Sequence, residues 1–323
     1  MSNRRLTYLD FCKFFAMLMV TWGHCAQSIS GETFPCFLGG GGKLIAFHMP
    51  LFFIVSGYLM NTDKIRNKPF LKFIQEKSQR LIVPAVCWYL ILSITSLHMP
   101  KLLGTVTFYW YLTALFICNI IIWFAVKCCK HRGAVATIAI AFVLLCPGMD
   151  FVNINFMMPF LWFGIWIRYS DVLNKRYSQI FFIASVVIGM ALYQIWNENF
   201  TVYKAPFIID AIDTEMCFKY IVRFAIGVSL SFAVMWIGKR FQNNRFISLP
   251  AQLGKYTLLA YTFSFVLNNF MSYFLRKAGL NTSEPLILEV TSLLWAITIY
   301  FLTVKLYNVL SRYKFTRFLL LGE

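Results

Sequence analysis

The chain has 323 residues, of which 59% are hydrophobic and only 13% are charged, and its mean hydropathy is +0.65. In soluble domains about a quarter of the residues are charged, so this composition excludes a soluble protein and indicates an integral membrane protein. The formal net charge of +17 would fit nucleic-acid binding only if the basic residues were not explained by their positions along the chain.

Apolar windows of about 17–25 residues predict ten transmembrane helices. We therefore expect an all-α integral membrane protein, with residues 1–323 in a single transmembrane domain. We expect no appended soluble domain. We also expect no cleavable signal peptide, because the first apolar stretch lacks the succession of a basic region, a short apolar region and a small-residue cleavage site. The windows lie at 7–28, 43–61, 81–97, 106–126, 134–149, 151–167, 179–197, 217–238, 253–275 and 286–309.

Basic residues are distributed unevenly between alternate connections of these windows. The two termini and four connections hold twenty Lys and Arg residues, whereas the opposite connections hold five. The positive-inside rule then predicts that both termini are cytoplasmic. Because sidedness explains most of the basic charge, we expect no nucleic-acid partner. The expected location is the cell (plasma or inner) membrane, crossed many times.

The first window carries an acid, a base and an imidazole inside an apolar helix. Lys13 and His24 are eleven residues apart, close to three helical turns, so they share one face at a separation of about 16 Å. Asp10 precedes Lys13 by three residues and is expected to pair with it. Separately, these residues fit positions at the membrane interface. Together on one stripe, they indicate a polar cavity.

The second window adds a second imidazole. This window runs inward from the outer side, so His48 is expected at about the same depth as His24. Pro50 leaves a backbone carbonyl without its helical partner, and neighbours or cavity water must satisfy that carbonyl. No third His or carboxylate has the spacing of a metal ligand, and the nine cysteines are scattered without a CxxC pattern. We therefore expect neither a metal site nor a disulfide framework.

Basic residues accumulate before the third window. The predicted cytoplasmic loop 62–80 holds six of them, including Lys77 and Arg80. A purely topological role stays open for this charge. At the mouth of the third helix, Lys77 and Arg80 also suit the binding of phosphate groups.

Polar and aromatic residues of the later windows have two interpretations each. Trp110 and Tyr111 fit either stacking on a sugar ring or an aromatic belt at the outer interface. Arg223 and Glu289 lie near the outer ends of the eighth and tenth windows, where they fit substrate binding or, more commonly, a structural ion pair. Asn268 fits sugar binding or, more commonly, a hydrogen bond between helices.

Several of these segments resemble membrane-bound acyltransferase family 3. The nearest branch contains the fucose 4-O-acetylase-like and surface-polysaccharide O-acetyltransferases. The resemblance rests on the spacing of Lys13 and His24 and on the segments "HMPLFFIVSGYL" and "KSQRLIVPAVCWYL". Further matches are "FYWYLTALF" at 108–116 and "FLWFGIWI" at 160–167, so the resemblance spans nearly the whole chain.

The ninth window matches the family with one departure. In "LGKYTLLAYTFSFVL" the positions of Gly254, Thr257, Leu258 and Tyr261 agree with the family pattern. Ser264 stands where many relatives carry His. Any role that the family gives to that His is therefore in doubt for this chain.

The resemblance implies an O-acyltransferase. Such an enzyme transfers an acyl group, usually acetyl from cytoplasmic acetyl-CoA, to a hydroxyl of a carbohydrate or cell-surface glycan at the outer face. Lys13 and His24 occupy the positions that the family associates with activity. Lys77 and Arg80 occupy the two basic positions of its Arg-x-x-Arg motif, and Lys at the first position keeps the charge but not the bidentate contact.

These residues support a mechanistic hypothesis. His24 acts as general base on the acceptor hydroxyl, because an imidazole exchanges protons near neutral pH. His48, or a backbone N–H near Pro50, stabilises the oxyanion or orients His24. Lys13, Lys77 and Arg80 bind acetyl-CoA, which is the acyl-donor substrate. The acceptor, the use of succinyl in place of acetyl, an acyl-His intermediate and the oligomeric state all stay open.

Two other classes of protein are alternatives to an acyltransferase. A transporter or exporter of a glycan precursor or small solute also fits many spans with charges inside them. Against it, the chain has neither repeated halves nor paired broken helices at corresponding positions. Acetyl-CoA-dependent release of free CoA would separate the two classes. A non-catalytic scaffold does not explain the alignment of Lys13, His24 and His48.

Overall fold

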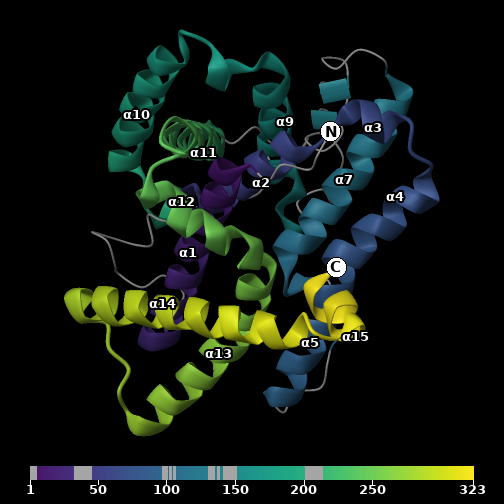
Figure 1. Cartoon of the computed structure of the whole chain (residues 1–323). Helices are drawn as coiled ribbons and strands as arrows, with labels where there is room; N and C mark the ends of the chain where they lie inside the picture. Colours follow the sequence, from purple (N-terminus) through teal and green to yellow (C-terminus); the bar gives the residue numbers. More distant parts are fainter. Residues whose placement is uncertain are drawn as a thin grey trace. The chain divides into compact units, whose positions relative to one another are not determined.

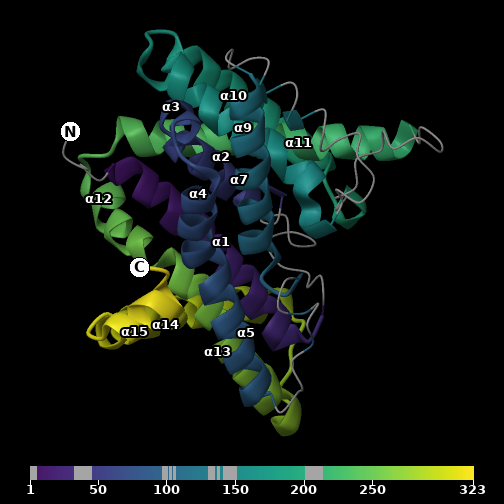
Figure 2. The same cartoon turned by 90° about the vertical axis from the view of Figure 1, so that its right-hand side faces the viewer.

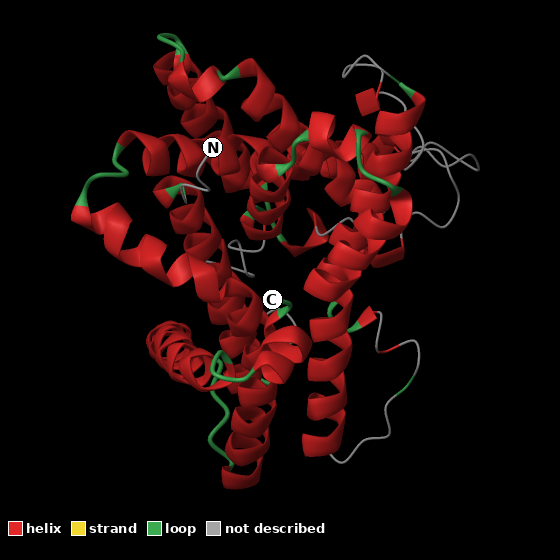
Figure 3. Cartoon of the chain, turned by 45° about the vertical axis from the view of Figure 1, so that its right-hand side comes forward, coloured by secondary structure: helices red, strands yellow, loops and turns green. Residues whose placement is uncertain are grey.

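The protein, described by a computed structural model, consists of helices joined by turns, and its described residues contain no strand (Figure 3). The predicted all-α class is confirmed. The described residues are 6–32, 46–96, 101, 104, 107–129, 135–136, 139–140, 151–200 and 214–323. The longer helices are α1 (Thr7–Ser30), α2 (His48–Leu59), α4 (Phe70–Lys77), α5 (Val83–Thr95), α7 (Trp110–Cys128), α9 (Ile154–Ser170), α10 (Ser178–Ile195), α11 (Thr214–Arg240), α13 (Thr257–Ala278) and α14 (Pro285–Leu310) (Figure 1).

Short helical elements connect or extend these helices. Among them are two π-helical turns, η2 and η7, in which the backbone is wider than in an α-helix. The short elements are α3 (Thr62–Arg66), η2 (Ser78–Ile82), η3 (Phe151–Asn153), η4 (Val172–Asn174), η5 (Glu198–Phe200), α12 (Arg245–Ala251), η6 (Gln252–Tyr256), α15 (Lys314–Thr316) and η7 (Arg317–Leu321).

Within the described part of the chain, six helical stretches are long and apolar enough to cross a membrane. A continuous helix satisfies its backbone N–H and C=O groups internally, as the interior of a bilayer requires. These stretches make the chain a multi-pass helical membrane protein, whereas the number of ten spans and the cytoplasmic side of the termini stay predictions. The six are Phe70–Thr95, Trp110–Cys128, Ser178–Ile195, Thr214–Arg240, Arg245–Ala278 and Pro285–Leu310.

Nine of the ten predicted windows contain a helix, and the fifth, 134–149, lies mostly outside the described residues. Three of these helices are not among the six membrane-crossing stretches. α9 has 17 residues and is shorter than each of the six. α2 has only 12 residues. α1 has 24 residues, but Asp10, Lys13 and His24 lower its hydropathy.

The third helix begins earlier than predicted. It runs without a break from Phe70 through η2 to Thr95, so the expectation of a loop at 62–80 is wrong. No Gly or Pro interrupts residues 70–83, and all four charged residues there are good helix formers. Pro84 has no N–H to donate to the carbonyl of Arg80, which explains why the helix widens into a π-turn at this point.

The described chain divides into two compact units built from interleaved segments. The first comprises residues 1–52, 172–201 and 225–310, and the second comprises residues 53–171, 202–224 and 311–323. In the first unit, α1 packs against α12, η6, α13 and α14 (Figure 1). In the second unit, α4 continues through η2 into α5, and α7 packs beside α4 (Figure 2).

In the first unit, α1 and α14 run in opposite directions. Near the start of α1, Phe14 contacts Tyr300, with ring centroids 5.1 Å apart. Two turns later, Trp22 Nε1 donates a hydrogen bond of 2.9 Å to Ser292 Oγ, which lies earlier in α14. This antiparallel pairing is what the predicted order of spans requires of the first and the tenth.

The second unit contains a close helix crossing between two segments of the family resemblance. A Cβ on Gly57 of α2 would overlap the carbonyl oxygen of Leu161, and one on Gly164 of α9 would overlap that of Ile54. Small residues allow membrane helices to approach with their backbones in contact. This contact gives a structural reason for glycine in both "HMPLFFIVSGYL" and "FLWFGIWI".

Candidate functional site

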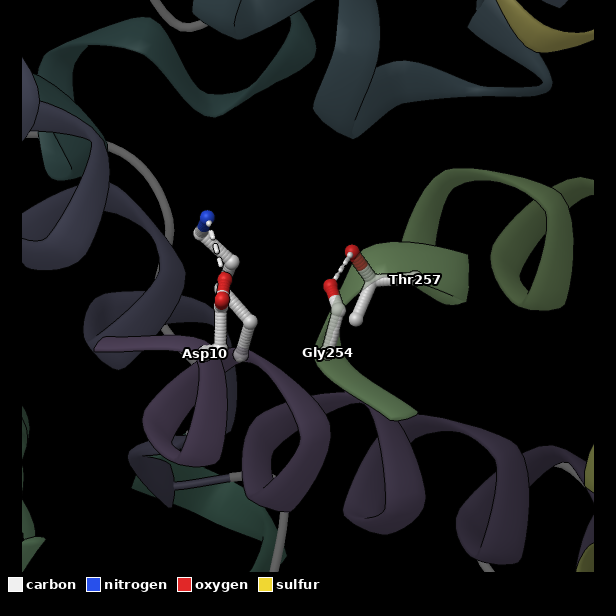
Figure 4. Close-up of polar contacts among 4 residues, drawn as sticks. Asp10, Gly254 and Thr257 are labelled. Atoms are coloured by element: carbon white, nitrogen blue, oxygen red, sulfur yellow. Dashed lines mark hydrogen bonds and ion pairs between the residues drawn. The ribbon is translucent and has the colours of Figure 1, made fainter. Parts of the chain in front are cut away.

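The first candidate cluster lies on α1, which is one uninterrupted helix through Asp10, Lys13 and His24. Asp10 is buried, and its Oδ1 lies 3.2 Å from the ammonium of Lys13, which confirms the predicted pairing (Figure 4). Three residues of spacing place both side chains on one face of the helix. Lys13 therefore has a local carboxylate partner in this structure.

A glycine from the ninth window packs directly on this pair. A Cβ on Gly254 would overlap the backbone carbonyl of Asp10, so only glycine allows η6 to approach α1 this closely. Thr257 Oγ1 donates a hydrogen bond of 3.3 Å to the carbonyl oxygen of Gly254 and fixes the turn (Figure 4). A pocket of about 400 Å³ beside Asp10 also includes Lys255. The Gly and Thr of the family pattern thus shape the turn that covers Asp10.

His24 is held by two neighbours. Its Nδ1 lies 2.7 Å from Oε1 of Gln27, one turn further along α1. Its ring lies 4.7 Å from that of Phe265 on α13. With the amide in this orientation, Nδ1–H donates to Gln27, and the lone pair of the imidazole lies on Nε2. A lone pair on Nε2 is what a general base needs.

Hydrogen bonds between helices surround this part of α1. Asn268 Oδ1 of α13 accepts from Trp295 Nε1 of α14 at 3.0 Å and from Cys25 Sγ of α1 at 3.5 Å. The structure therefore supports the interhelical use of Asn268 that is the more common one in membranes. Ser264, at the position where many relatives carry His, is fully buried and donates to the carbonyl of Tyr261 at 2.9 Å.

His48 is the first residue of α2 and is buried. The ring of its neighbour Phe47 lies 6.4 Å from that of Phe15 on α1. Phe15 precedes His24 by nine residues, so the described contact brings the start of α2 against an earlier part of α1. The equal depth of His24 and His48 and the oxyanion role of His48 stay predictions.

The second candidate cluster is a pocket of about 480 Å³ inside the second unit. We call it the basic pocket, because four of its lining residues are basic and one is acidic. Lys77 and Arg80 both belong to it, so the two residues chosen from the sequence share one cavity. Its lining residues are Ser56, Leu59, Met60, Asn61, Lys64, Ile65, Lys68, Phe73, Glu76, Lys77, Arg80, Leu81, Leu115 and Asn119.

The charged side chains of the basic pocket differ in their partners and in their exposure. Lys68 forms an ion pair with Glu76, which is the acidic residue among the described residues of the lining. The ammonium of Lys77 lies 5.5 Å from the ring centroid of Phe73. Arg80 is exposed, on the π-turn η2. After the ion pair is counted, three basic side chains remain to attract an anion to the pocket.

The C-terminal segment packs on the turn that carries Arg80. Trp88 Nε1 of α5 donates a hydrogen bond of 3.1 Å to the carbonyl of Leu320 in η7. Gly322 has a φ of 68°, and a Cβ placed on it would lie 2.9 Å from the carbonyl oxygen of Arg80. Residues far apart in the sequence therefore fix the shape of η2.

The other residues chosen from the sequence lie in packed surroundings. The rings of Tyr111 and Phe53 are 5.4 Å apart, and the Tyr111 hydroxyl shares a hydrogen bond with Ser56, so Tyr111 helps to pack α7 on α2. Trp110 is half-buried at the start of α7. Arg223 is buried with its guanidinium 4.7 Å from the ring of Phe156.

Glu289 is half-buried on α14. Its pairing with Arg223, and the binding of acceptor by Arg223, Glu289, Trp110 or Tyr111, stay predictions. Across the described residues, no group of three His, Cys, Asp or Glu side chains comes together in the way that a metal ion requires. The expected absence of a metal also stays a prediction.

Sequence reasoning missed two residues of these clusters. Gln27 is three residues after His24, and this helical spacing was a signal that could have identified it. Asn119 lines the basic pocket from α7, more than thirty residues after Arg80. No local pattern joins Asn119 to Arg80, because only the packing of α7 against η2 brings them into one cavity.

A family model described as an acyltransferase domain matches residues 6–306 of the chain. The chain belongs to the acyltransferase 3 family. This match includes both α1 with Lys13 and His24 and the helix with Lys77 and Arg80. It confirms the family resemblance, and it makes the protein a membrane-bound acyltransferase.

Two relatives of the chain carry the same name. The chain is 25% identical over 290 residues to the nodulation protein NolL of Mesorhizobium japonicum, which covers 80% of this chain and 75% of that protein. It is 34% identical over 89 residues to the nodulation protein NolL of Sinorhizobium fredii, which covers 27% of this chain and 24% of that protein. No solved structure matches the chain.

Proposed function

We propose that this acyltransferase transfers an acyl group, most often acetyl, from cytoplasmic acyl-CoA to a hydroxyl of a carbohydrate or cell-surface glycan. The acceptor lies at the outer face of the cell membrane. The observation that carries the proposal is the 2.7 Å contact of His24 Nδ1 with Gln27 Oε1. This contact leaves Nε2 as the basic nitrogen on a helix that also carries Lys13.

The basic pocket supports acyl-CoA as the donor. The nucleotide end of CoA carries several negative charges, and the pocket presents three basic side chains beyond the Lys68–Glu76 ion pair. Lys77 and Arg80 are proposed to hold the phosphates, with Arg80 able to form two parallel hydrogen bonds and Lys77 acting as a point charge. Lys13 is proposed to contact the donor further along its pantetheine arm.

The transfer step is proposed to be direct. His24 Nε2 takes the proton of the acceptor hydroxyl as its oxygen bonds to the thioester carbonyl carbon. The carbon–sulfur bond then breaks, and the sulfur of CoA leaves and receives the proton from the imidazolium. His48, or a backbone N–H near Pro50, is proposed to donate to the oxyanion that forms between these steps.

A carbohydrate acceptor rests on two supports. One is the likeness of the sequence motifs to the branch of the family that acetylates surface polysaccharides. The other is the presence of aromatic and charged side chains, Trp110, Tyr111, Arg223 and Glu289, in segments predicted to reach the outer leaflet. Aromatic faces stack on sugar rings, and charged groups bind hydroxyls.

The first test is the change His24→Ala in purified, well-folded protein. We expect loss of acetyl transfer by at least a hundredfold, because a positioned general base contributes on that order or more. The measurements are release of free CoA from acetyl-CoA and incorporation of labelled acetyl into envelope glycans. Lys13→Gln is the companion variant, with an expected rise in the apparent KM for acetyl-CoA and transfer retained at saturation.

Each outcome has a distinct meaning. Near-normal turnover by His24→Ala would contradict the role of His24 as base. An unchanged apparent KM in Lys13→Gln would remove Lys13 from the donor site. Movement of a glycan or solute without any acetyl-CoA-dependent release of CoA would replace acyl transfer by the transporter alternative.

A further inference from the structure

Asn119 combines burial with an incomplete set of hydrogen bonds. It is 1% exposed on α7, and its Nδ2 donates to the carbonyl of Leu115 at 2.6 Å. Its Oδ1 has no hydrogen-bond partner among the described residues. A buried acceptor left without a partner is unfavourable, so a polar partner from outside the protein is expected at this atom.

The position of Asn119 in the basic pocket indicates what that partner is. Lining residues at the rim, such as Lys64, Glu76 and Arg80, are exposed and charged. Buried apolar residues, among them Met60 and Leu115, accompany Asn119 in the interior. A ligand that fits this pocket is anionic at one end and mostly apolar beyond it, with a hydrogen-bond donor that reaches the interior.

The pantetheine arm of CoA has this character. It joins the charged nucleotide to the thioester through a narrow chain with two amide groups, and each amide carries an N–H donor. Lysine and arginine at the rim suit the phosphates, and a single amide oxygen in an apolar interior suits one N–H. A purely anionic ligand without such an arm would leave Oδ1 of Asn119 without a partner.

We propose that Oδ1 of Asn119 accepts a hydrogen bond from one pantetheine amide of the acyl-CoA donor and selects pantetheine thioesters over other anionic nucleotides. The inference rests on the proposed function, because it assumes an acyl-CoA in the basic pocket. Asn119 is a specificity residue on this view: it contacts the arm of the donor and takes no part in the proton transfer.

The test compares two ligands that share adenosine with phosphates at its 3′ and 5′ positions. Acetyl-CoA extends from the 5′ phosphate through a second phosphate into the pantetheine arm. Acetyl-CoA carries pantetheine, and adenosine 3′,5′-bisphosphate does not. We expect Asn119→Leu to weaken the binding of acetyl-CoA about tenfold, as the loss of one buried hydrogen bond predicts, and to leave the binding of the bisphosphate unchanged. We expect Arg80→Ala to weaken the binding of both ligands.

Equilibrium binding to the purified full chain is the measurement. Asn67→Leu is the matched control, because Asn67 is exposed and lies outside the pocket lining. This control is expected to bind both ligands as the unmodified protein does. Wild-type affinity of Asn119→Leu for acetyl-CoA would overturn the proposal. An equal loss of both ligands would also overturn it, because Asn119 would then only hold the pocket together.

A second measurement needs no substitution in the protein. Two acetyl-CoA analogues, each with one pantetheine amide N–H replaced by an ester oxygen, are bound to the unmodified chain. We expect one analogue to bind about tenfold more weakly than acetyl-CoA and the other to bind about equally well. If both analogues bind like acetyl-CoA, the proposal is wrong even if Asn119→Leu fails to fold.

The failure of this inference is distinguishable from failure of the proposed function. Unmodified protein that binds no acetyl-CoA, or releases no CoA from it, would contradict acyl-CoA as the donor and the inference with it. Unmodified protein that uses acetyl-CoA while Asn119→Leu retains full affinity would contradict only the role of Asn119.

Discussion

His24 is oriented by one hydrogen bond and one ring contact. With Oε1 of Gln27 as its partner, Nδ1 of His24 is the nitrogen that carries the proton, and the ring of Phe265 packs against the imidazole. A base that is already oriented loses less freedom when the acceptor binds, so its proton transfer is faster. If His24 is the proposed general base, Gln27 is a positioning residue: it acts on the reaction through His24 and not by contact with either substrate.

Replacement of Gln27 tests this role at the scale of one residue. We expect Gln27→Leu to lower kcat about tenfold, because one hydrogen bond that orients the imidazole is lost. The KM for acetyl-CoA should change little. Gln27→Glu keeps an oxygen acceptor at the same place and should recover most of the lost rate. The measurement is steady-state release of CoA over a range of acetyl-CoA concentrations.

The two variants together separate positioning from simple structural support. A structural role predicts that both changes lower the rate along with the yield of folded protein, as seen by size-exclusion chromatography and thermal unfolding. Equal activity of Gln27→Leu and the unmodified chain would show that Gln27 does not orient the base.

Among the helical elements, the helix Phe70–Thr95 and the C-terminal segment pack against each other. Pro84 interrupts the hydrogen bonding of this helix, η2 widens around Arg80, and η7 packs against both η2 and α5. π-Turns inside α-helices often occur at functional sites, since they redirect a side chain. The C-terminal segment therefore helps to aim Arg80 at the basic pocket.

The change Gly322→Ala tests this arrangement. Its φ of 68° is unfavourable for alanine, and the added Cβ would crowd the backbone of Arg80. We expect the KM for acetyl-CoA to rise about fivefold, which corresponds to a loss of about 1 kcal/mol of donor binding. The value of kcat should stay within about twofold, because His24 lies on a different element.

Gly279→Ala is the matched control for this prediction. Gly279 also has a positive φ, of 65°, but a Cβ there would meet nothing within 4 Å. The control therefore carries the same backbone strain without the contact to Arg80. If both variants raise the KM equally, strain in general and not the position of η2 is responsible. If neither variant changes it, the C-terminal segment does not affect the donor site.

For the whole molecule, the sequence predicted the helices better than their ends or their contacts. Hydropathy located nine described helices, since long apolar stretches need internal hydrogen bonds in a bilayer. It missed the start at Phe70, because Lys72, Glu76 and Lys77 lower hydropathy while they favour a helix. Hydropathy identifies the residues that cross the membrane, whereas helix propensity and Pro84 determine where this helix begins and where it widens.

A candidate site could be predicted from the sequence when its residues are close together along the chain. The pairing of Asp10 with Lys13 follows from helical spacing alone, and the structure contains it. The basic pocket is different, because it joins α2, α3, the helix through η2, and α7. Lys77 and Arg80 were found by charge and by family resemblance. Asn119 is one polar residue in an apolar helix, and only tertiary packing brings it into the pocket.

Helix directions in the first unit lead to a prediction about topology. α1 runs parallel to the stretch of η6 and α13, because Gly254 meets Asp10 near its start and Phe265 meets His24 further along. α14 runs antiparallel to α1. If both helices cross the membrane, residue 6 and residue 310 lie on the same side. The termini and the connections on their side hold most of the basic residues. The positive-inside rule then predicts that residue 6 and residue 310 face the cytoplasm.

Reporter fusions test this prediction on the chain in a cell membrane. Alkaline phosphatase, which is active only outside the cytoplasm, is expected to be active when fused after Gly279 and inactive when fused after Glu323. A cytoplasmic fluorescent reporter should show the reverse, because the 26 residues of α14 span about 39 Å and are enough to cross the hydrocarbon core. The same activity at both sites would mean that α14 does not cross. Inverted activities would place the C-terminus outside the cytoplasm and would contradict the predicted cytoplasmic side of the termini.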